Sequence, residues 1–459
     1  MEVGTMRTLS IIKADTGGWV GHSSVHPDQE AAAGRELRRA IESGLVDDAH
    51  VASCGDDLAL IMSHRHGADA QVVHSFAWDV FRRTSAVADE LGLHGGTRDD
   101  VVGAGRKRAG PHPAGADRAA TDGAESDRVQ SDGAEPDGVR SHGVESHDVE
   151  PDDVTPDGEL RGPGLGYAEL EIGEERPSEP VLCFLTDQAQ PGAWNYPLFR
   201  TFADPFTSSG LVVDPAMREG FVFEVYDLQE NTAVELACPA ETYDLLLYVG
   251  APSRYVIHCV RSAATGVVAA ATSTQRLSLI AGRSAGQDDP VMIVRAESGL
   301  PSVGEVLEPF AFPYSVAGGL RGAHRAPLMP VGLDDAHPTR SDGPPRVVCL
   351  GFQLTDGELI GPRDMFADPS FDRARSRAVE VMDHYRHHGP FEPHRLAPDP
   401  LRGTTTPVPD ERLASRWVPL TAADVRTPEA LRKARQAREQ AAQDHRAPGR
   451  PTEKEVSGP

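Results

Sequence analysis

Hydrophobic residues along this chain follow two patterns. Short apolar runs bounded by polar or turn residues predict β-strands, and they lie at residues 8–13, 181–186, 221–225, 255–260, 276–281, 291–294 and 346–351. Apolar residues that recur every three or four positions predict amphipathic helices, and they lie at residues 28–43, 70–91, 241–248 and 370–388. Gly44 and Gly389 directly follow the first and last of these helices, as is typical of helix C-termini. Many strands with few helices indicate an α/β or α+β fold, with stacked sheets and the helices outside.

Two segments break this pattern. Residues 121–150 form an imperfect ten-residue repeat, TDGAESDRVQ, SDGAEPDGVR and SHGVESHDVE. Residues 121–160 hold 13 acidic residues, two arginines and almost no bulky apolar residues, so they cannot offset the entropy of ordering. We therefore expect a disordered acidic insertion at residues 103–157, within one domain of residues 1–402 that is followed by an extended or helical polar tail at 403–459. The insertion is either a tolerated surface loop or a functional acidic tether.

The overall charge narrows the range of partners. The 459 residues include 70 Asp and Glu against 45 Lys and Arg, a net charge of −25 that gives little electrostatic support for binding nucleic acid. No apolar run approaches the roughly 18 residues that a membrane span needs, and no long apolar leader is present. The five cysteines include no C-x-x-C pair, which favours reduced thiols in the core. We expect a cytoplasmic protein that binds neither nucleic acid nor membrane.

Adjacent aspartates are the clearest chemical signal in the sequence. Six Asp-Asp pairs occur in this acidic chain, so one pair alone means little. Asp56 and Asp57 run directly into the apolar residues 58–62, and Asp288 and Asp289 lie between two apolar runs. Adjacent charges beside buried strands are costly unless a cation compensates them.

Two further residues fit the same pattern. Asp15 and Asp187 each follow an apolar run, and His22 lies in the loop after Asp15. Carboxylates gathered from four strand ends are suited to Mg²⁺ held between protein and a substrate phosphate, whereas the lack of paired Cys or His ligands disfavours zinc there. The alternative for each aspartate alone is that it caps a strand end or a turn. Their joint occurrence favours the metal site.

Nine segments resemble a known family, and they occur in the family's order between residues 11 and 396. They are IIKADTGGWVGH, GDDLALIM, LGLH, RGPGLGYAELEIGEER, QPGAWNYPLFRTFADPF, LIAGRSAGQDDPVMIVR, RGAHRAPLMPV, DGPPR and HGPFEPHRL. Together they resemble the archaeal-type fructose-1,6-bisphosphate aldolase/phosphatases, the class V fructose-1,6-bisphosphatases. In that family one Mg²⁺-dependent site joins two triose phosphates through a lysine Schiff base and then removes the 1-phosphate of the product. The resemblance implies a single four-layer α-β-β-α sandwich and a homo-oligomer, usually an octamer.

The resemblance also implies roles for individual residues. It assigns the metal site to Asp15, His22, Asp56, Asp57, Asp187, Asp288 and Asp289. It assigns contacts with the sugar phosphate to His22, His94, Gln188, Arg321 and Asp342.

Several positions depart from the family's pattern. Gln287 stands where the Schiff-base lysine is expected, and Ser284 stands where the catalytic tyrosine is expected. Gln188 replaces a phosphate-binding lysine, Arg98 a metal-bound glutamine, and His94 a substrate-binding tyrosine. The remaining altered substrate positions are Gly158–Glu159, Glu297 and His384, with Tyr385 as the alternative to His384. The carboxylates and imidazole of the metal site are all present, so the changes fall on binding and activation of the sugar.

The sequence therefore favours a Mg²⁺-dependent sugar-phosphate phosphatase, acting on fructose 1,6-bisphosphate in gluconeogenesis, with Asp15 as the base that activates water. Aldolase activity is expected to be lost, because no lysine lies between Lys107 and Lys433, and Lys13 precedes Asp15 on the same strand face. One alternative is a catalytically impaired homologue that binds a sugar phosphate or metal as a regulatory or assembly subunit. The other is a still bifunctional aldolase/phosphatase.

Overall fold

The computed structural model of this chain describes residues 6–19, 23–93, most of 166–272, most of 290–384 and 411–420. The acidic insertion expected at 103–157 lies outside the described residues, as does most of the tail expected at 403–459. The α-helices are α1 (Pro27–Glu42), α2 (Gln71–Leu91), α3 (Asn195–Phe202), α5 (Thr242–Val249) and α8 (Glu411–Ala414). None of these described helices is long and apolar enough to cross a membrane.

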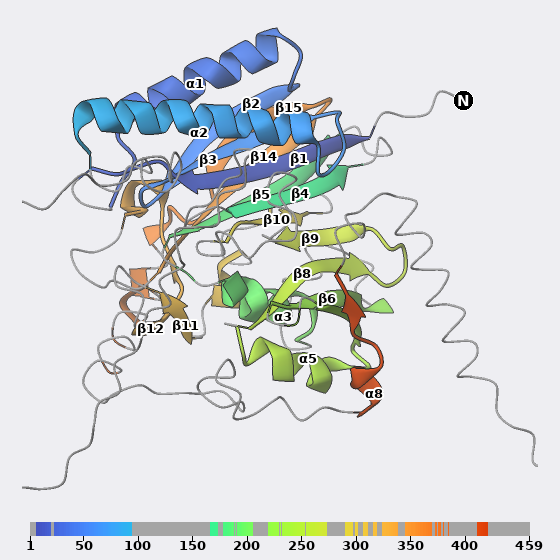
Figure 1. The fold of residues 1–459 in the computed structure, drawn as a ribbon. Helices are drawn as coiled ribbons and strands as arrows, with labels where there is room; N and C mark the ends of the chain where they lie inside the picture. Colours follow the sequence, from blue (N-terminus) through green and yellow to red (C-terminus); the bar gives the residue numbers. More distant parts are fainter. Residues whose placement is uncertain are drawn as a thin grey trace, which may run out of the picture.

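Two β-sheets form the body of the fold (Figure 1). The smaller sheet is antiparallel and has four strands in the order β2 (Asp48–Cys54), β3 (Asp57–His64), β1 (Arg7–Asp15) and β4 (Gly166–Ile172). The larger sheet has ten strands, nine of them in the order β13 (Met329–Pro330), β14 (Arg346–Thr355), β5 (Ser178–Asp187), β10 (Met292–Arg295), β9 (Val268–Thr272), β8 (Tyr255–Ser262), β6 (Phe221–Asp227), β7 (Thr232–Cys238) and β16 (Val418–Pro419). The tenth strand, β15 (Glu358–Asp364), pairs with β14, and β11 (Ser315–Gly318) and β12 (His324–Pro327) form a separate pair.

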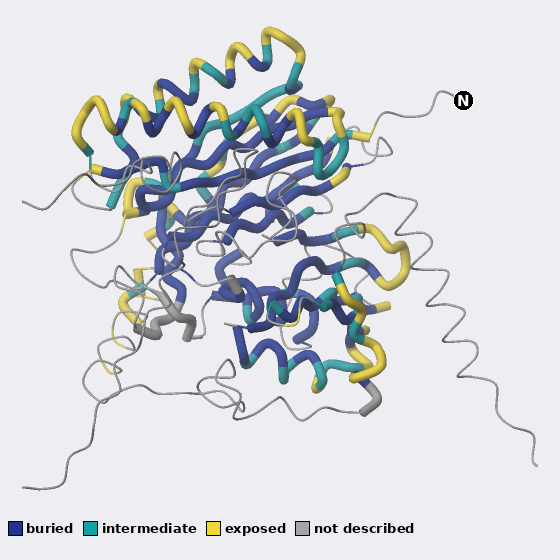
Figure 2. Tube along the Cα trace, viewed as in Figure 1, coloured by how far each residue is buried: buried dark blue, intermediate teal, exposed yellow. Residues whose placement is uncertain are grey.

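Side-chain alternation along the strands divides the core into three hydrophobic clusters. On β1, Leu9 and Ile11 pack between the two sheets against residues such as Cys183 of β5. The intervening Ile12 points to the other face of the smaller sheet and packs against α1 and α2. A third cluster covers the larger sheet beneath α3 and α5, and Figure 2 shows the strands buried and the outer turns of α1 exposed. The α+β class predicted from the sequence is confirmed, and the complete four-layer sandwich stays a prediction.

Most predicted elements correspond to observed ones. The helices predicted at 28–43, 70–91 and 241–248 are α1, α2 and α5, and the described residues between 372 and 384 are helical. Six predicted strands are β1, β5, β6, β8, β10 and β14, whereas the strand expected at 276–281 lies outside the described residues. The sequence patterns did not separate the remaining strands from loops.

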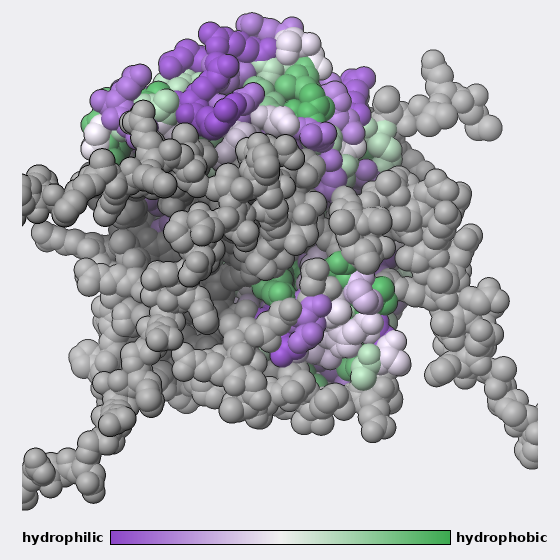
Figure 3. Space-filling view, viewed as in Figure 1, coloured by the Kyte–Doolittle hydropathy of each residue, from purple (hydrophilic) through white to green (hydrophobic). Residues whose placement is uncertain are grey.

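Helix α1 begins and ends where local chemistry requires. His26 is its N-cap: the imidazole accepts a hydrogen bond from the Asp28 backbone N–H, and the Gln29 side chain accepts one from the His26 N–H. Gly44 adopts φ 73° just after the helix, a left-handed conformation that glycine adopts without strain. Ala33 and Leu37 line the buried face, and hydrophilic side chains cover the exposed side of α1 and α2 (Figure 3).

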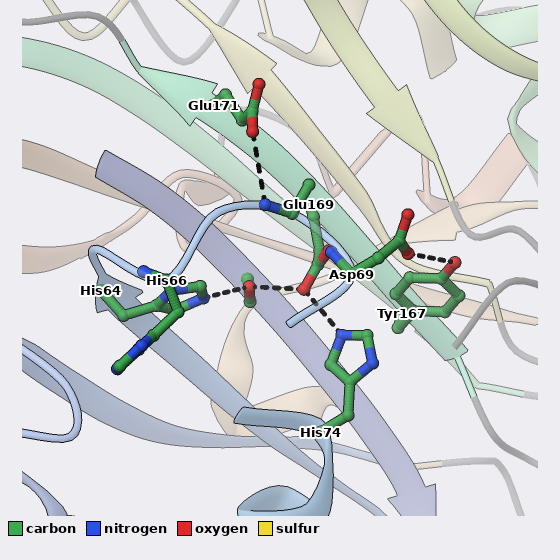
Figure 4. Close-up of polar contacts among 9 residues, drawn as sticks. His64, His66, Asp69, His74, Tyr167, Glu169 and Glu171 are labelled. Carbon is green, nitrogen blue, oxygen red and sulfur yellow. Dashed lines mark hydrogen bonds and ion pairs between the residues drawn. The ribbon is translucent and has the colours of Figure 1, made fainter. Parts of the chain in front are cut away.

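A buried polar network ties α2 to the smaller sheet (Figure 4). At its centre, Glu169 of β4 accepts hydrogen bonds from the Ser10 hydroxyl at 2.9 Å and from the Asp69 backbone N–H at 2.5 Å, and its carboxylate lies 2.8 Å from His74 Nε2. His64 Nε2 lies 2.8 Å from the Ser10 hydroxyl. Because burial of unpaired polar groups is costly, this network fixes the helix register on the sheet.

The network makes stability depend on pH through His64. Burial is the main cause that lowers the pKa of His64 from 6.5 to about 4; Glu169 and Asp47 oppose the shift, and His66 and His74 add to it. The unfolded chain therefore binds a proton below pH 6.5 that the folded chain binds only near pH 4, so stability is complete above pH 6.5 and falls as the pH decreases toward 4.

We expect the shifted titration of His64 to reduce the free energy of unfolding by on the order of 3 kcal/mol between pH 6.5 and pH 4. Urea denaturation at a series of pH values measures it. The variant His64→Gln should show a shallower slope between pH 6.5 and pH 4, and an unchanged slope would contradict the assignment to His64.

Candidate functional site

Strand pairing in the smaller sheet brings the first two predicted aspartates together. Asp15 is the last residue of β1 and Asp57 is the first residue of β3, and the antiparallel register places them directly opposite each other. The backbone N–H of Gly17 donates a hydrogen bond to Asp15 Oδ1 at 2.8 Å, which fixes the orientation of this carboxylate. Asp15 is half-buried, whereas Asp57 is 1% exposed.

The turn between β2 and β3 brings a third and a fourth carboxylate to the same place. Gly55 and Asp56 form this turn, and Gly55 has φ 64°. A Cβ atom at Gly55 would lie 2.2 Å from both Cγ and Oδ1 of Asp187, the last residue of β5 in the other sheet. Only glycine therefore allows the Asp187 carboxylate to approach the turn this closely. The Gly55 N–H also donates to the carbonyl oxygen of Ala336 at 2.5 Å.

Lys13 connects the two sheets immediately beneath these carboxylates. Its Nζ atom donates to Asp57 Oδ2 at 2.6 Å and to the carbonyl oxygen of Thr186 at 2.7 Å. The Lys13 side chain is fully buried, and the ion pair with Asp57 has no access to bulk water. Lys13 thus neutralises one carboxylate of the cluster and holds the end of β1 against the end of β5.

The second Asp-Asp pair lies outside the described residues, but the chain beside it is placed. The Thr186 hydroxyl donates to the carbonyl oxygen of Pro290 at 2.7 Å, and Pro290 directly follows Asp289. Pro290 therefore lies at the end of β5 that carries Asp187.

Arg346 adds a buried cation on the neighbouring strand. It begins β14 and pairs in register with Asp187. Burial lowers the pKa of Arg346, while the nearby Cys54, Asp335 and Asp187 oppose that shift. Because a guanidinium stays protonated even so, Arg346 supplies positive charge beside the carboxylates.

The structure thus brings together Asp15, Asp56, Asp57 and Asp187 at one end of the two facing sheets. The other predicted site residues lie outside the described part of the chain: His22, His94, Arg98, Gln188, Ser284, Gln287, Asp288, Asp289, Arg321 and Asp342. His384 is described, is helical and is exposed.

Sequence reasoning did not assign Gly55 and Arg346 to the site and did not foresee the contact between Lys13 and the other sheet. The spacing of Lys13 and Asp15 on one strand face was the available signal for Lys13. The close approach of Asp187 to Gly55 depends on how the sheets stack, so the sequence carried no signal for it.

The donor set fits Mg²⁺, which prefers carboxylate oxygens and retains several of its waters. Among the described residues, no three of these carboxylates have oxygen atoms that all lie within 4.8 Å of one another. Two divalent ions about 3.5–4 Å apart are a common arrangement in phosphatases.

Comparison with known proteins decides the family. The family described as Fructose-1,6-bisphosphatase matches residues 6–114 and 151–418, which is most of the chain. The chain belongs to the fructose-1,6-bisphosphatase family. The family match omits residues 115–150, which hold the acidic repeats.

Curated relatives of this fructose-1,6-bisphosphatase family member are similar over nearly their whole length. The fructose-1,6-bisphosphate aldolase/phosphatase of Moorella thermoacetica is 47% identical over 428 residues, 93% of this chain and 98% of that protein. Proteins of the same name from Ignicoccus hospitalis and Thermococcus kodakarensis are 47% and 45% identical, over 90% and 92% of this chain and 93% and 100% of their own lengths. The resemblance is confirmed, and with it the expected enzyme class, a fructose-1,6-bisphosphatase-type hydrolase.

Proposed function

We propose that this protein is a Mg²⁺-dependent phosphatase that removes the 1-phosphate of fructose 1,6-bisphosphate in gluconeogenesis. The observation that carries the proposal is the meeting of Asp15, Asp56, Asp57 and Asp187 at facing strand ends of two sheets. The names of the curated relatives support the substrate. We also propose the cytoplasm as its location and a homo-oligomer, an octamer by family resemblance, as its assembly.

Each group in the site has a task that follows from its position. Bound Mg²⁺ supplies charge neutralisation for the phosphoryl oxygens and the leaving alkoxide. Asp15 is half-buried and oriented by the Gly17 N–H, so it is placed to take a proton from the attacking water. Asp57 is oriented by Lys13, and Asp187 is oriented by its approach to the Gly55 turn. Pre-oriented carboxylates lower the cost of reorganisation during phosphoryl transfer.

The test is phosphate release from fructose 1,6-bisphosphate, with and without Mg²⁺. Turnover that requires Mg²⁺ supports the phosphatase. Tight binding of fructose 1,6-bisphosphate without phosphate release would instead favour an impaired homologue acting as a regulatory or assembly subunit. The changes at Gln188, Ser284 and Gln287 are the features that favour that second function.

We further propose that Schiff-base aldolase chemistry is absent. A Schiff base needs an uncharged amine that can reach the substrate carbonyl. Among the described residues, Lys13 is the only lysine, and its ammonium is fully buried. It donates to Asp57 and to the Thr186 carbonyl oxygen, and hydrogen bonds to an anion favour a charged ammonium. The other three lysines are Lys107, Lys433 and Lys454, and Gln287 cannot form a Schiff base.

We expect no covalent adduct when the protein is treated with borohydride in the presence of dihydroxyacetone phosphate. Intact mass and peptide mapping measure the outcome. An adduct on any lysine would show that an amine reaches the substrate and would support the bifunctional alternative. The aldolase/phosphatase of Moorella thermoacetica, treated identically, provides the positive comparison.

A further inference from the structure

Strands β6 and β8, which are neighbours in the larger sheet, bring a carboxylate, an imidazole and a thiol together. Donor atoms of Glu224, His258 and Cys259 all lie within 4.8 Å of one another. The Cys259 thiol donates to Glu224 Oε2 with a distance of 3.2 Å. His258 and Cys259 are buried, whereas Glu224 is half-exposed, so solvent reaches the cluster from the carboxylate side.

A β-bulge explains why two consecutive residues of β8 face the same carboxylate. Glu224 pairs with Cys259, but the next residue, Val225, pairs with Ile257, so His258 is an extra residue in β8. At a bulge, two residues of one strand lie opposite one residue of the other. In a regular strand, His258 and Cys259 would point to opposite faces and could not share a ligand.

Neighbouring groups hold this bulge in shape. The Thr272 hydroxyl donates to the carbonyl oxygen of Ile257 at 2.7 Å and lies 3.3 Å from that of His258. The Tyr226 ring stacks on the His258 imidazole with a centroid distance of 4.5 Å. The histidine is therefore oriented before any ligand arrives, which lowers the entropic cost of binding.

An arginine beside the cluster is held by a second glutamate. Arg261 forms an ion pair with Glu235, the residue opposite Glu224 on β7. The Arg261 guanidinium is thus paired with Glu235, while Glu224 Oε2 accepts the hydrogen bond from the Cys259 thiol.

We propose that Glu224, His258 and Cys259 form a zinc site that clips β6 to β8. A mixed set of carboxylate, imidazole and thiolate donors suits Zn²⁺ and disfavours Mg²⁺, which prefers oxygen alone. Zinc bonds of about 2.0–2.3 Å place tetrahedral donor atoms roughly 3–4 Å apart. The three donor atoms lie within 4.8 Å of one another, so shifts of about 1 Å in the side-chain ends bring them to zinc-binding distance. Binding converts the Cys259 thiol to a thiolate and releases its proton to solvent, and one coordination position stays with water.

This site is separate from the aspartate cluster. Strands β10 and β9 lie between β5, which ends at Asp187, and β8. None of the three donors belongs to the aspartate cluster, so the proposal does not rest on the proposed phosphatase function.

The first experiment adds Co²⁺ alone to the metal-free full-length protein and records its near-ultraviolet absorption. A thiolate bound to Co²⁺ gives a charge-transfer band, whereas Co²⁺ on the aspartates, which include no sulfur, gives none. We expect the band in the unmodified protein and in Asp187→Asn, and its loss in Cys259→Ser. Cys238→Ser is the matched control, because Cys238 is also a buried cysteine of the same sheet but lies on β7 outside the cluster.

The second experiment measures Zn²⁺ affinity by competition with a chromophoric chelator. Cys259→Ser, His258→Gln and Glu224→Gln should each weaken the sulfur-containing site by at least about tenfold, while phosphate release stays unchanged. Affinity should rise with pH because binding releases a proton. A charge-transfer band that survives in Cys259→Ser, or Zn²⁺ affinity unaffected in all three variants, would overturn the proposal.

Discussion

Replacing Asp56 by alanine or Asp187 by asparagine will reduce Mg²⁺-dependent phosphate release from fructose 1,6-bisphosphate by at least about 100-fold. Both carboxylates lie at the junction of the two sheets, and Asp187 Oδ1 would be 2.2 Å from a Cβ atom on Gly55 beside Asp56. Loss of one metal-binding carboxylate removes several kcal/mol of transition-state stabilisation, and each 1.4 kcal/mol corresponds to a factor of ten in rate. Steady-state phosphate release across a Mg²⁺ titration measures this effect.

The matched control is Asp89→Ala, which removes an exposed carboxylate from the last turns of α2. Its turnover should remain within about twofold of the unmodified protein, because Asp89 is exposed and lies on α2, away in the sequence from the strand ends that carry the aspartates. Circular dichroism confirms that each variant is folded. Undiminished turnover in both Asp56→Ala and Asp187→Asn would disprove the assignment of the site.

Replacing Lys13 by methionine will reduce the free energy of unfolding by about 3–5 kcal/mol, because it leaves the buried Asp57 carboxylate without its cation. Lys13 Nζ and Asp57 Oδ2 lie 2.6 Å apart in a buried position. The same ammonium donates to the Thr186 carbonyl oxygen of the facing sheet. Urea denaturation with a chelator present measures the change without any contribution from bound metal.

Two comparisons make this prediction specific. Arg39→Met removes an ion pair of similar length, 2.7 Å to Glu36, from the exposed surface of α1, and it should cost no more than about 1 kcal/mol. The double variant Lys13→Met/Asp57→Asn should recover part of the loss, because it removes both buried charges together. A Lys13→Met protein as stable as Arg39→Met would contradict the role of Lys13 as a buried link between the sheets.

The individual strand ends could be predicted from the sequence because they depend on local pattern. The apolar run before Asp15 forms β1, and the run before Asp187 forms β5, each with its aspartate as the last residue. Helix α2 was equally clear, because the apolar period at 70–91 predicted it and it is observed at Gln71–Leu91. Hydrophobic period and turn residues act within a few positions, so one sequence is enough to read them.

Contacts between elements could not be read in the same way. Ser10, His64 and Glu169 share no feature in the sequence, yet pairing of three strands places them in one buried network. The bulge that turns His258 and Cys259 toward Glu224 likewise results from a register shift between two strands. Such shifts depend on the whole sheet, and no residue pattern marked this one.

The sequence by itself determined the family, the α+β class and the aspartates that end the strands, because collinear motifs and apolar periods are properties of the chain. Only the tertiary structure decided which of these groups meet. The stacking of two sheets places Asp187 against Gly55 and inserts Lys13 between Asp57 and Thr186. The contacts of Asp187 with Gly55 and of Lys13 with Thr186 join residues more than 100 positions apart in the chain, where local propensity has no influence.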